Sequence, residues 1–205
     1  MKIQPDHQPE RPPNRSRRAL ANRERLYEAA ISLFEQRGFQ HTSMDEIAKA
    51  AGMARASAFN HFPSKLLFLA EFFHRFTGEV IDAASSAKIS GFRNQLEALF
   101  AAIGPIAHAN KPIMREITAL TMGHGPLAPV ESEVDDEMLN FFRAIVVQGQ
   151  ANGEVDPEWD QDFLAELMLG LLTVTANDWV NLGQERSLQK ELSMRFEVLL
   201  QGMAA

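Results

Sequence analysis

The chain has 205 residues, 45% of them hydrophobic, a formal net charge of −7 and no cysteine. This is the composition of a globular protein, and the lack of cysteine excludes disulfides, cysteine-ligated metal sites and thiol nucleophiles. The longest apolar run, residues 163–174, contains Glu166 and falls short of the roughly 20 apolar residues of a membrane span. Residues 1–13 lack the apolar stretch of a signal peptide, so we expect a cytoplasmic protein.

The charge is unevenly distributed along the chain. Residues 1–66 hold 11 Lys and Arg against 7 Asp and Glu, whereas residues 67–205 hold 9 against 20. A basic end attached to an acidic body suggests that the end meets a polyanion and the body does not. An ordinary solvated surface with a chance imbalance is the alternative interpretation.

The N-terminal part predicts an arm followed by a first helix. Residues 1–15 are polar and proline-rich, so we expect a disordered basic arm. Helical periodicity starts at about Arg17 and ends at Arg37, where Gly38 is a natural left-handed cap. One apolar face of this helix is formed by Leu26, Ala29, Ala30, Leu33 and Phe34.

Two short helices are predicted next. Ser43 and Glu46 have the spacing of a capping box, which starts a helix over residues 44–51. Gly52 supplies the positive φ of a sharp turn, and a third helix is expected over residues 54–61. Pro63 ends it, and a fourth helix is expected to run into the mid-80s.

The remainder of the chain also has helical periodicity. Gly104-Pro105 and Lys111-Pro112 are predicted to bracket a break, and a loop is predicted at residues 123–129. A helix that starts in the acidic segment 131–137 is expected to end at Gly149, and two long apolar helices are expected to finish the chain. No turn-bounded alternation indicates a strand. The fold class predicted is all-α, with about nine helices.

Residues 43–61 have the pattern of a helix-turn-helix. Ala48 is small enough for a close helix crossing, and Gly52 fits the turn between the helices. The second helix of such a motif presents its N-terminal turn to the major groove of DNA. A plain helical hairpin in a bundle core is the alternative. The residues expected to point outward favour the DNA-binding motif over the plain hairpin, because no acidic residue lies between Glu46 and Glu71.

The segment RERLYEAAISLFEQRGFQHTSMDEIAKAAGMARASAFNHFPSK, residues 23–65, resembles the N-terminal domain of the TetR/AcrR family of transcriptional repressors. The resemblance implies a three-helix DNA-binding domain over residues 16–66 and a ligand-binding and dimerisation domain over residues 67–205. It also implies a homodimer that joins through the last two helices. The segment departs from the family pattern at Ala54, where a Ser cap is common, and at Phe59, where Tyr is common.

The same resemblance implies DNA contacts at nine positions. Arg55 and Ala56 would face base edges, and the other positions would hold phosphates or add polar and aromatic contacts. The nine residues are Thr42, Ser43, Arg55, Ala56, Ser57, Phe59, Asn60, His61 and Lys65. Arginines of the arm region could reach a phosphate or the minor groove as well. They are Arg11, Arg15, Arg17 and Arg18.

The acidic body is expected to hold the effector and the dimer interface. We expect dimerisation through residues 158–181 and 185–203. The stripes assigned to this interface are Leu164, Met168, Leu171 and Thr175, and Leu188, Leu192, Phe196 and Leu199. Pocket walls need apolar side chains and a few polar groups. The candidates are Phe76, Phe100, His108, Met114, Met122, Phe141, Gln148, Met168, Thr175 and Trp179.

The function predicted is a DNA-binding transcriptional regulator, a repressor that a small molecule releases from a palindromic operator. The second hypothesis is an all-α ligand-binding or scaffold protein whose helix-turn-helix no longer binds DNA, which the departures at Ala54 and Phe59 favour. An enzyme is the third hypothesis, and no catalytic constellation, phosphate-binding glycine loop or metal-ligand spacing favours it. We therefore expect no catalytic residue, no metal and no cofactor.

Overall fold

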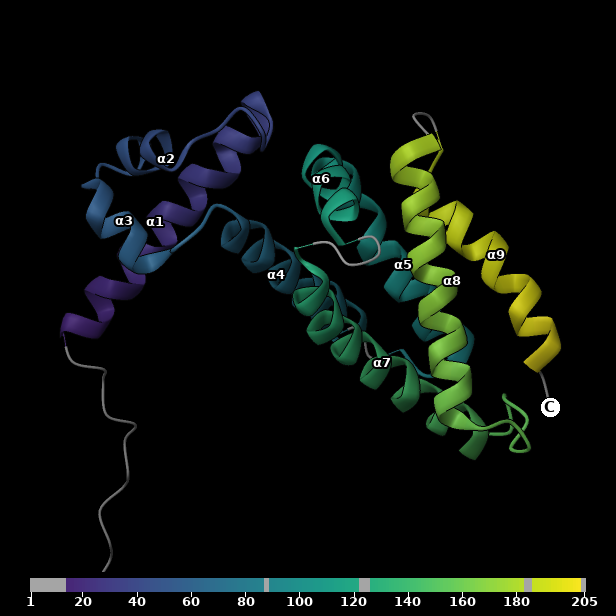
Figure 1. Cartoon of the computed structure of the whole chain (residues 1–205). Coiled ribbons are helices and arrows are strands. Elements are labelled where there is room, and N and C mark those ends of the chain that lie inside the picture. The colour runs from purple at the N-terminus through teal and green to yellow at the C-terminus, as the bar shows by residue number, and fades with distance from the viewer. Residues whose placement is uncertain (1–13, 87–88, 122–125, 183–185, 204–205) are drawn as a thin grey trace, which may run out of the picture. The chain divides into compact units, whose positions relative to one another are not determined.

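A computed structural model describes residues 14–86, 89–121, 126–182 and 186–203, and these residues form nine helices and no strand. The predicted all-α class is thus confirmed for the described part of the chain (Figure 1). The helices are α1 (Asn14–Arg37), α2 (Met44–Ala50), α3 (Arg55–His61), α4 (Leu66–Ser86), α5 (Phe92–Ala109), α6 (Lys111–Thr121), α7 (Ala128–Ala151), α8 (Gln161–Leu182) and α9 (Leu188–Met203).

The chain divides into two compact units, Met1–Lys65 and Leu66–Ala205. The expected arm over residues 1–15 lies outside the described residues except for its last two, which already belong to α1. Helix α1 therefore begins three residues before the predicted Arg17. The predicted domain boundary after residue 66 stays a prediction, one residue from the division between the two units.

The first unit consists of α1, α2 and α3 around a small apolar core. Each of the three helices packs against the other two. Leu26, Phe34, Ile47 and Ala58 are fully or almost fully buried at the centre. Positive φ values at Gly38 and Gly52 make the two tight turns, which L-residues with a Cβ enter only at a cost. The core thus fixes the angle at which α3 leaves the turn.

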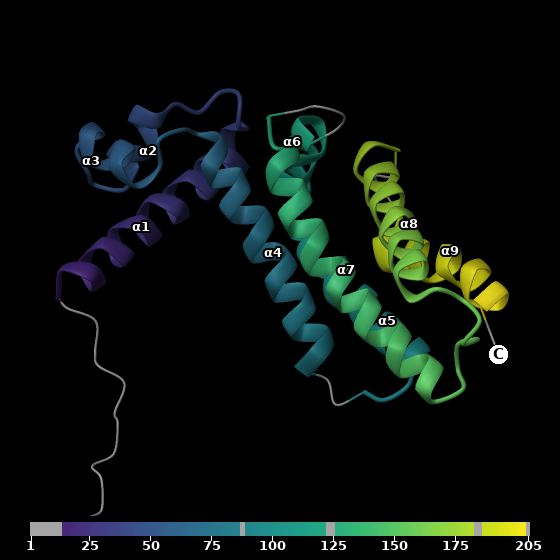
Figure 2. The same cartoon turned by 60° about the horizontal axis from the view of Figure 1, so that its bottom comes forward.

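The second unit is a bundle of α4 to α9. Helix α7 packs against α4 and α8, and α9 packs against α5 and α8. Figure 2 shows α4, α7 and α8 side by side. The core includes Phe100, Phe142 and Phe196. The Phe196 ring contacts both of the others, with centroid distances of 4.8 Å to Phe100 and 6.4 Å to Phe142.

The break predicted between Gly104-Pro105 and Lys111-Pro112 is present but shorter than the bracket, because it consists of Asn110 alone. Helix α5 continues through Pro105 and ends at Ala109, with Asn110 as its C-cap. A proline in a helix removes one backbone hydrogen bond, but Leu96, Leu99 and Ile103 anchor this helix in the core before the proline. Burial of that face outweighs the loss of one hydrogen bond, so the helix persists.

Helix α8 is apolar almost all round. It is the one helix among the described residues that is long and apolar enough to cross a membrane, through Gln161–Asn181. One such helix is weak evidence for a span, because the core helix of a bundle has the same composition. Leu164, Met168 and Leu172 are buried within the unit, as in a core helix.

Candidate DNA-binding site and body cavity

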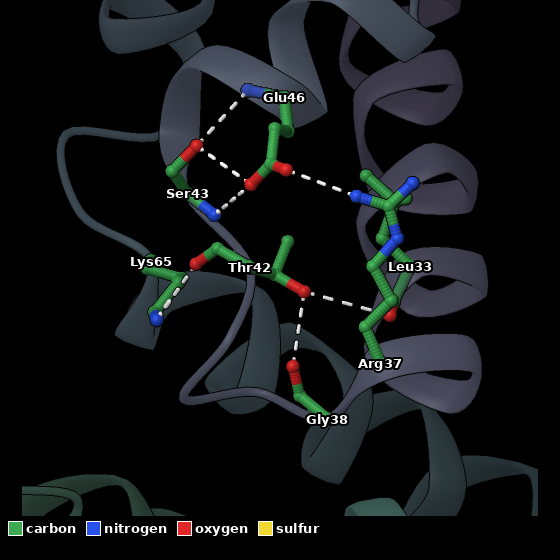
Figure 3. Close-up of polar contacts among 7 residues, drawn as sticks. All are labelled: Leu33, Arg37, Gly38, Thr42, Ser43, Glu46 and Lys65. Carbon is green, nitrogen blue, oxygen red and sulfur yellow. Dashed lines mark hydrogen bonds and ion pairs between the residues drawn. The ribbon is translucent and has the colours of Figure 1, made fainter.

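The entry to α2 is held by a capping box that the sequence predicted. The Glu46 backbone N–H donates to the Ser43 hydroxyl over 3.3 Å, and the Ser43 backbone N–H donates to the Glu46 carboxylate over 2.8 Å (Figure 3). Arg37 at the end of α1 also donates to Glu46, over 2.9 Å. The Ser43 backbone N–H and hydroxyl, together with Arg37, lower the pKa of Glu46 below its usual value.

The loop between α1 and α2 is fastened by Thr42 and Lys65. The Thr42 hydroxyl donates to the Gly38 carbonyl over 3.0 Å, and the side chain is buried (Figure 3). The Lys65 Nζ donates to the carbonyls of Phe39 and Thr42 over 2.6 and 2.8 Å and lies 4.2 Å from the Phe39 ring centre. Lys65 thus ties the first turn after α3 back to the loop before α2.

This geometry limits three of the predicted contacts. The Thr42 hydroxyl is buried and bonded to the backbone, so a phosphate contact through it stays a prediction that requires this bond to open. Ser43 already donates its hydroxyl proton to Glu46. The Lys65 ammonium is already bonded to two carbonyls. Phosphate contacts by Ser43 and Lys65 stay predictions, and they must add to these bonds or compete with them.

Helix α3 presents most of the remaining predicted DNA contacts to solvent. Its side chains at positions 55, 56, 57 and 60 are exposed, those at 59 and 61 are half-buried, and Ala58 alone is fully buried toward α1 and α2. Arginine, small residues and a hydroxyl at the first turn of such a helix are the groups that can approach base edges and phosphates. Ala54 is the N-cap of the helix and makes no side-chain hydrogen bond there, because a methyl group cannot accept one.

Asp45 is a neighbour of this surface that sequence reasoning missed. Its carboxylate accepts a hydrogen bond from the Arg55 guanidinium over 2.9 Å, with both side chains more than half exposed. The Arg55 guanidinium also lies 5.4 Å from the Phe59 ring centre. An exposed ion pair contributes only about 0–1 kcal/mol, so it holds Arg55 in place without preventing its transfer to another acceptor.

The family model described as "Bacterial regulatory proteins, tetR family" matches residues 26–72, which contain the second half of α1, all of α2 and α3, and the start of α4. Residues 26–72 thus form a DNA-binding domain of the TetR family. The chain is therefore a DNA-binding transcriptional regulator, and that family consists of regulators rather than enzymes.

Three relatives show how far the likeness to the TetR family extends. The transcriptional repressor DhaR of Mycobacterium sp. (strain GP1) is 25% identical over 72% of this chain and 76% of its own. The regulator AcrR of Shigella flexneri is 43% identical over 23% of this chain and 22% of its own. The solved structure of Thermus thermophilus FadR, a TetR-family repressor in complex with lauroyl-CoA, has a TM-score of 0.74, with 23% identity over 89% of this chain and 95% of its own.

The body encloses a cavity of about 320 Å³ between its helices. Its wall is mostly apolar, with Phe76 of α4, Met114 of α6 and Leu172 of α8 among the lining residues. Polar groups enter it from Thr77, Thr118, Asp135, Thr173 and Asn177. Burial raises the pKa of the Asp135 carboxyl, and the neighbouring Asp136 adds to that increase. The volume and composition are those of a small-molecule site.

Of the ten predicted pocket residues, Phe76 and Met114 line this cavity, and Met122 lies outside the described residues. The other seven lie elsewhere in the body, so their part in an effector site stays a prediction. His108 and Trp179 line a separate groove beside α9. The remaining five lie in the core or in other contacts, namely Phe100 against Phe196, Phe141 against Phe142, Gln148 bonded by Gln95, the fully buried Met168, and Thr175 bonded to the Leu171 carbonyl.

Most of the predicted dimer stripes face into the protomer. Six of the eight residues are buried, namely Leu164, Met168, Thr175, Leu188, Leu192 and Phe196, whereas Leu171 and Leu199 are half-buried and line a groove on the outside of α8 and α9. Because α8 is apolar on nearly every side, periodicity cannot tell its inner from its outer stripe. The outward apolar face of α8 and α9, here called the outer face, consists of Trp159, Phe163, Leu167, Val174, Met194 and Val198, each 42–75% exposed.

Among the described residues, no group of three or more His, Asp or Glu side chains is placed to hold a metal ion.

Proposed function

We propose that the chain is a homodimeric repressor that binds a palindromic operator and leaves it when a small apolar molecule fills the body cavity. The observation that supports this most directly is the exposed first turn of α3, with Arg55, Ala56 and Ser57 pointing away from the domain core. A two-fold dimer carries two copies of this turn, so its operator is expected to repeat one half-site in inverted order. Such a protein acts where the DNA is, in the cytoplasm.

Arg55 is the residue that we propose reads sequence. A guanidinium can donate two hydrogen bonds to the O6 and N7 atoms of guanine, which discriminates by about 1–3 kcal/mol. This exceeds the about 0–1 kcal/mol of the exposed pair with Asp45, so Arg55 is free energetically to exchange the carboxylate for a base. Ala54 and Ala56 have small side chains, which lets the helix backbone approach the groove.

The experiment is a competition between operator and scrambled DNA for Arg55→Ala and for Lys49→Ala, an exposed lysine on α2. The operator is sought first in the DNA beside the gene for this chain. We expect Arg55→Ala to weaken operator binding by about 1–3 kcal/mol per half-site and random binding far less. Lys49→Ala should leave the ratio of specific to random affinity unchanged. An equal loss on both DNAs for Arg55→Ala would assign this residue to a phosphate instead.

The outer face supports the proposed dimer. Phe163, Leu167 and Val174 recur at helical spacing on one side of α8, and Val198 continues the face on α9. A groove of about 710 Å³ runs between them and holds few polar side chains, Glu166 and Arg195. Contiguous apolar surface of this kind marks an interface. A two-fold axis would pack α8 and α9 of one protomer against α8 and α9 of its partner.

The dimer is tested with Val198→Glu and the matched control Val147→Glu, which places the same charge at an exposed valine of α7. Burying two symmetry-related carboxylates in an apolar interface should raise the dimer dissociation constant more than about 100-fold. Light scattering at micromolar concentration should then show a monomer for Val198→Glu and a dimer for the control. A monomeric parent protein would refute the dimer.

Release from the operator requires that the effector bind one arrangement of the dimer better than the other, since a ligand shifts an equilibrium only by its difference in affinity. The solved relative from Thermus thermophilus binds lauroyl-CoA. In the present chain the cavity offers an apolar chamber of about 320 Å³ for the apolar part of an effector. Effector release is tested by adding a cavity ligand to the preformed operator complex and following the loss of bound DNA.

A further inference from the structure

The acid in the body cavity has no counterpart of opposite charge there. Asp135 lies on the first turns of α7, between the buried residues Val134 and Met138 that line the same chamber. Within the part of the chain that the structure describes, its carboxylate has no hydrogen-bond or ion-pair partner. No Lys, Arg or His is among the described residues that line the cavity.

An ionised carboxylate at this place raises the free energy of the folded protein unless a ligand compensates its charge. Removing an ionised group from water costs free energy that only hydrogen bonds or an opposite charge return. The raised pKa of Asp135 reports this cost, and the adjacent Asp136 increases it. The hydroxyls of Thr77 and Thr118 and the amide of Asn177 add neutral polar groups to the chamber but no positive charge.

The rest of the wall selects an apolar body. Phenylalanine and aliphatic side chains from α4, α5, α6 and α8 surround the chamber, and its volume of about 320 Å³ suits a short alkyl chain or one or two rings. An anionic head would meet Asp135 without a cation to balance it, and like charges at close distance repel. A cationic head beside the carboxylate would satisfy both.

We propose that the cavity binds a small apolar molecule that carries a protonated amine, with the ammonium group against the Asp135 carboxylate and the hydrocarbon part against Phe76 and Met114. This inference rests on the proposed function for its regulatory meaning, but not for the binding itself. This ligand class differs from a fatty acyl-CoA such as the lauroyl-CoA of the solved relative, because the phosphates of the coenzyme A part are negatively charged.

The test compares three ligands of one size on the full-length protein without DNA, by calorimetry: n-octylamine, n-octanol and n-octanoate. Lauroyl-CoA is the fourth arm. We expect n-octylamine to bind at least about tenfold more tightly than n-octanol, with n-octanoate the weakest of the three. Equal binding of amine and alcohol, or tighter binding of n-octanoate or lauroyl-CoA, would overturn the proposal.

Two substitutions then locate the ammonium group. Asp135→Asn keeps the shape and removes the charge, and Asp136→Asn removes the same charge from the exposed neighbouring position. Asp135→Asn should weaken n-octylamine about tenfold and leave n-octanol unchanged, whereas Asp136→Asn should change the amine affinity less than about threefold. Equal effects of the two substitutions would show that only the general negative charge of the body attracts the amine.

The same experiment separates this inference from the proposed function. Binding measured without DNA tests the cavity alone. The operator assay then tests regulation. If n-octylamine binds through Asp135 but does not displace operator DNA, the ligand class stands and the release mechanism fails. If operator DNA binds normally and n-octylamine does not bind, the proposed ligand class fails and the proposed DNA-binding function stands.

Discussion

Lys65 offers the sharpest comparison between a structural and a DNA-binding role, and Lys65→Met separates the two. The substitution keeps most of the apolar stem and removes the ammonium group that donates to the Phe39 and Thr42 carbonyls. Hydrogen bonds to a charged group contribute about 1.5–3 kcal/mol, and contact with the Phe39 ring adds about 0.5–1 kcal/mol. Because the lysine is half-buried and its ammonium group keeps part of its hydration, we expect a net loss below the sum of these contributions, about 2–3 kcal/mol.

Hydrogen–deuterium exchange of the full-length protein measures this loss where it occurs. An opening free energy lower by about 2–3 kcal/mol corresponds to exchange faster by roughly 30- to 150-fold in α2 and in the loop before it. Amides of the body should be unaffected. Lys49→Met, which removes the same charge from an exposed site on α2, is the control and should change exchange only slightly.

The salt dependence of DNA binding decides the remaining question. If each Lys65 of a dimer also neutralises a phosphate, Lys65→Met should flatten the slope of log K against log salt by roughly 2 units. If Lys65 only fastens the loop, the affinity falls and the slope does not change. Unaltered exchange together with a flattened slope would refute the structural role derived from the geometry.

Three further outcomes follow from charges and contacts described above. Asp45→Asn removes a carboxylate beside the proposed DNA surface and releases Arg55, so a gel shift at low salt should show severalfold tighter DNA binding, and the gain should shrink as salt increases. Weaker binding would mean that the pair pre-positions Arg55. Asp135→Asn should raise the thermal midpoint of the unliganded body at pH 7. Because the pKa of Asp135 is raised in the folded state, ionising this carboxyl destabilises the folded body. This loss of stability is absent below the unfolded pKa and is complete once the pH has risen through the folded pKa. The gain should therefore vanish in acid, and a gain independent of pH would contradict this cause. Val174→Ala should weaken both n-octylamine binding and the dimer, since Val174 lines the cavity and the groove of the outer face, and an effect on neither would refute its double placement.

Local signals made the first unit predictable. The pairing of Ser43 with Glu46 and the positive φ of Gly38 and Gly52 depend on neighbours within a few residues, so their sequence spacing was sufficient. The exposed turn at Arg55 followed from the same spacing. The bond of Lys65 to the Phe39 carbonyl joins positions 26 residues apart, and no local pattern contains it.

The body was harder because its helices have apolar residues on more than one side. Met168 and Val174 of α8 are both apolar, yet one is buried in the protomer and the other faces outward. The cavity lies where neighbouring helices leave space between them. The sequence pattern of any one helix does not predict such a space. A polar residue inside an apolar stripe was the usable signal, since Thr77 follows Phe73 and Phe76 and precedes Val80 on the cavity side of α4.

Helix α8 separates the cavity from the outer face by the thickness of a single helix. Leu172 faces the cavity, Leu167 faces outward, and Val174 contributes to both surfaces. The proposed ligand site and the proposed dimer interface therefore share residues of α8. Selection cannot adjust one freely without testing the other, so a change of effector during evolution would be expected to proceed through α4, α6 and α7, whose cavity residues are absent from the outer face. A designer who retunes this protein as a biosensor would begin with the same three helices.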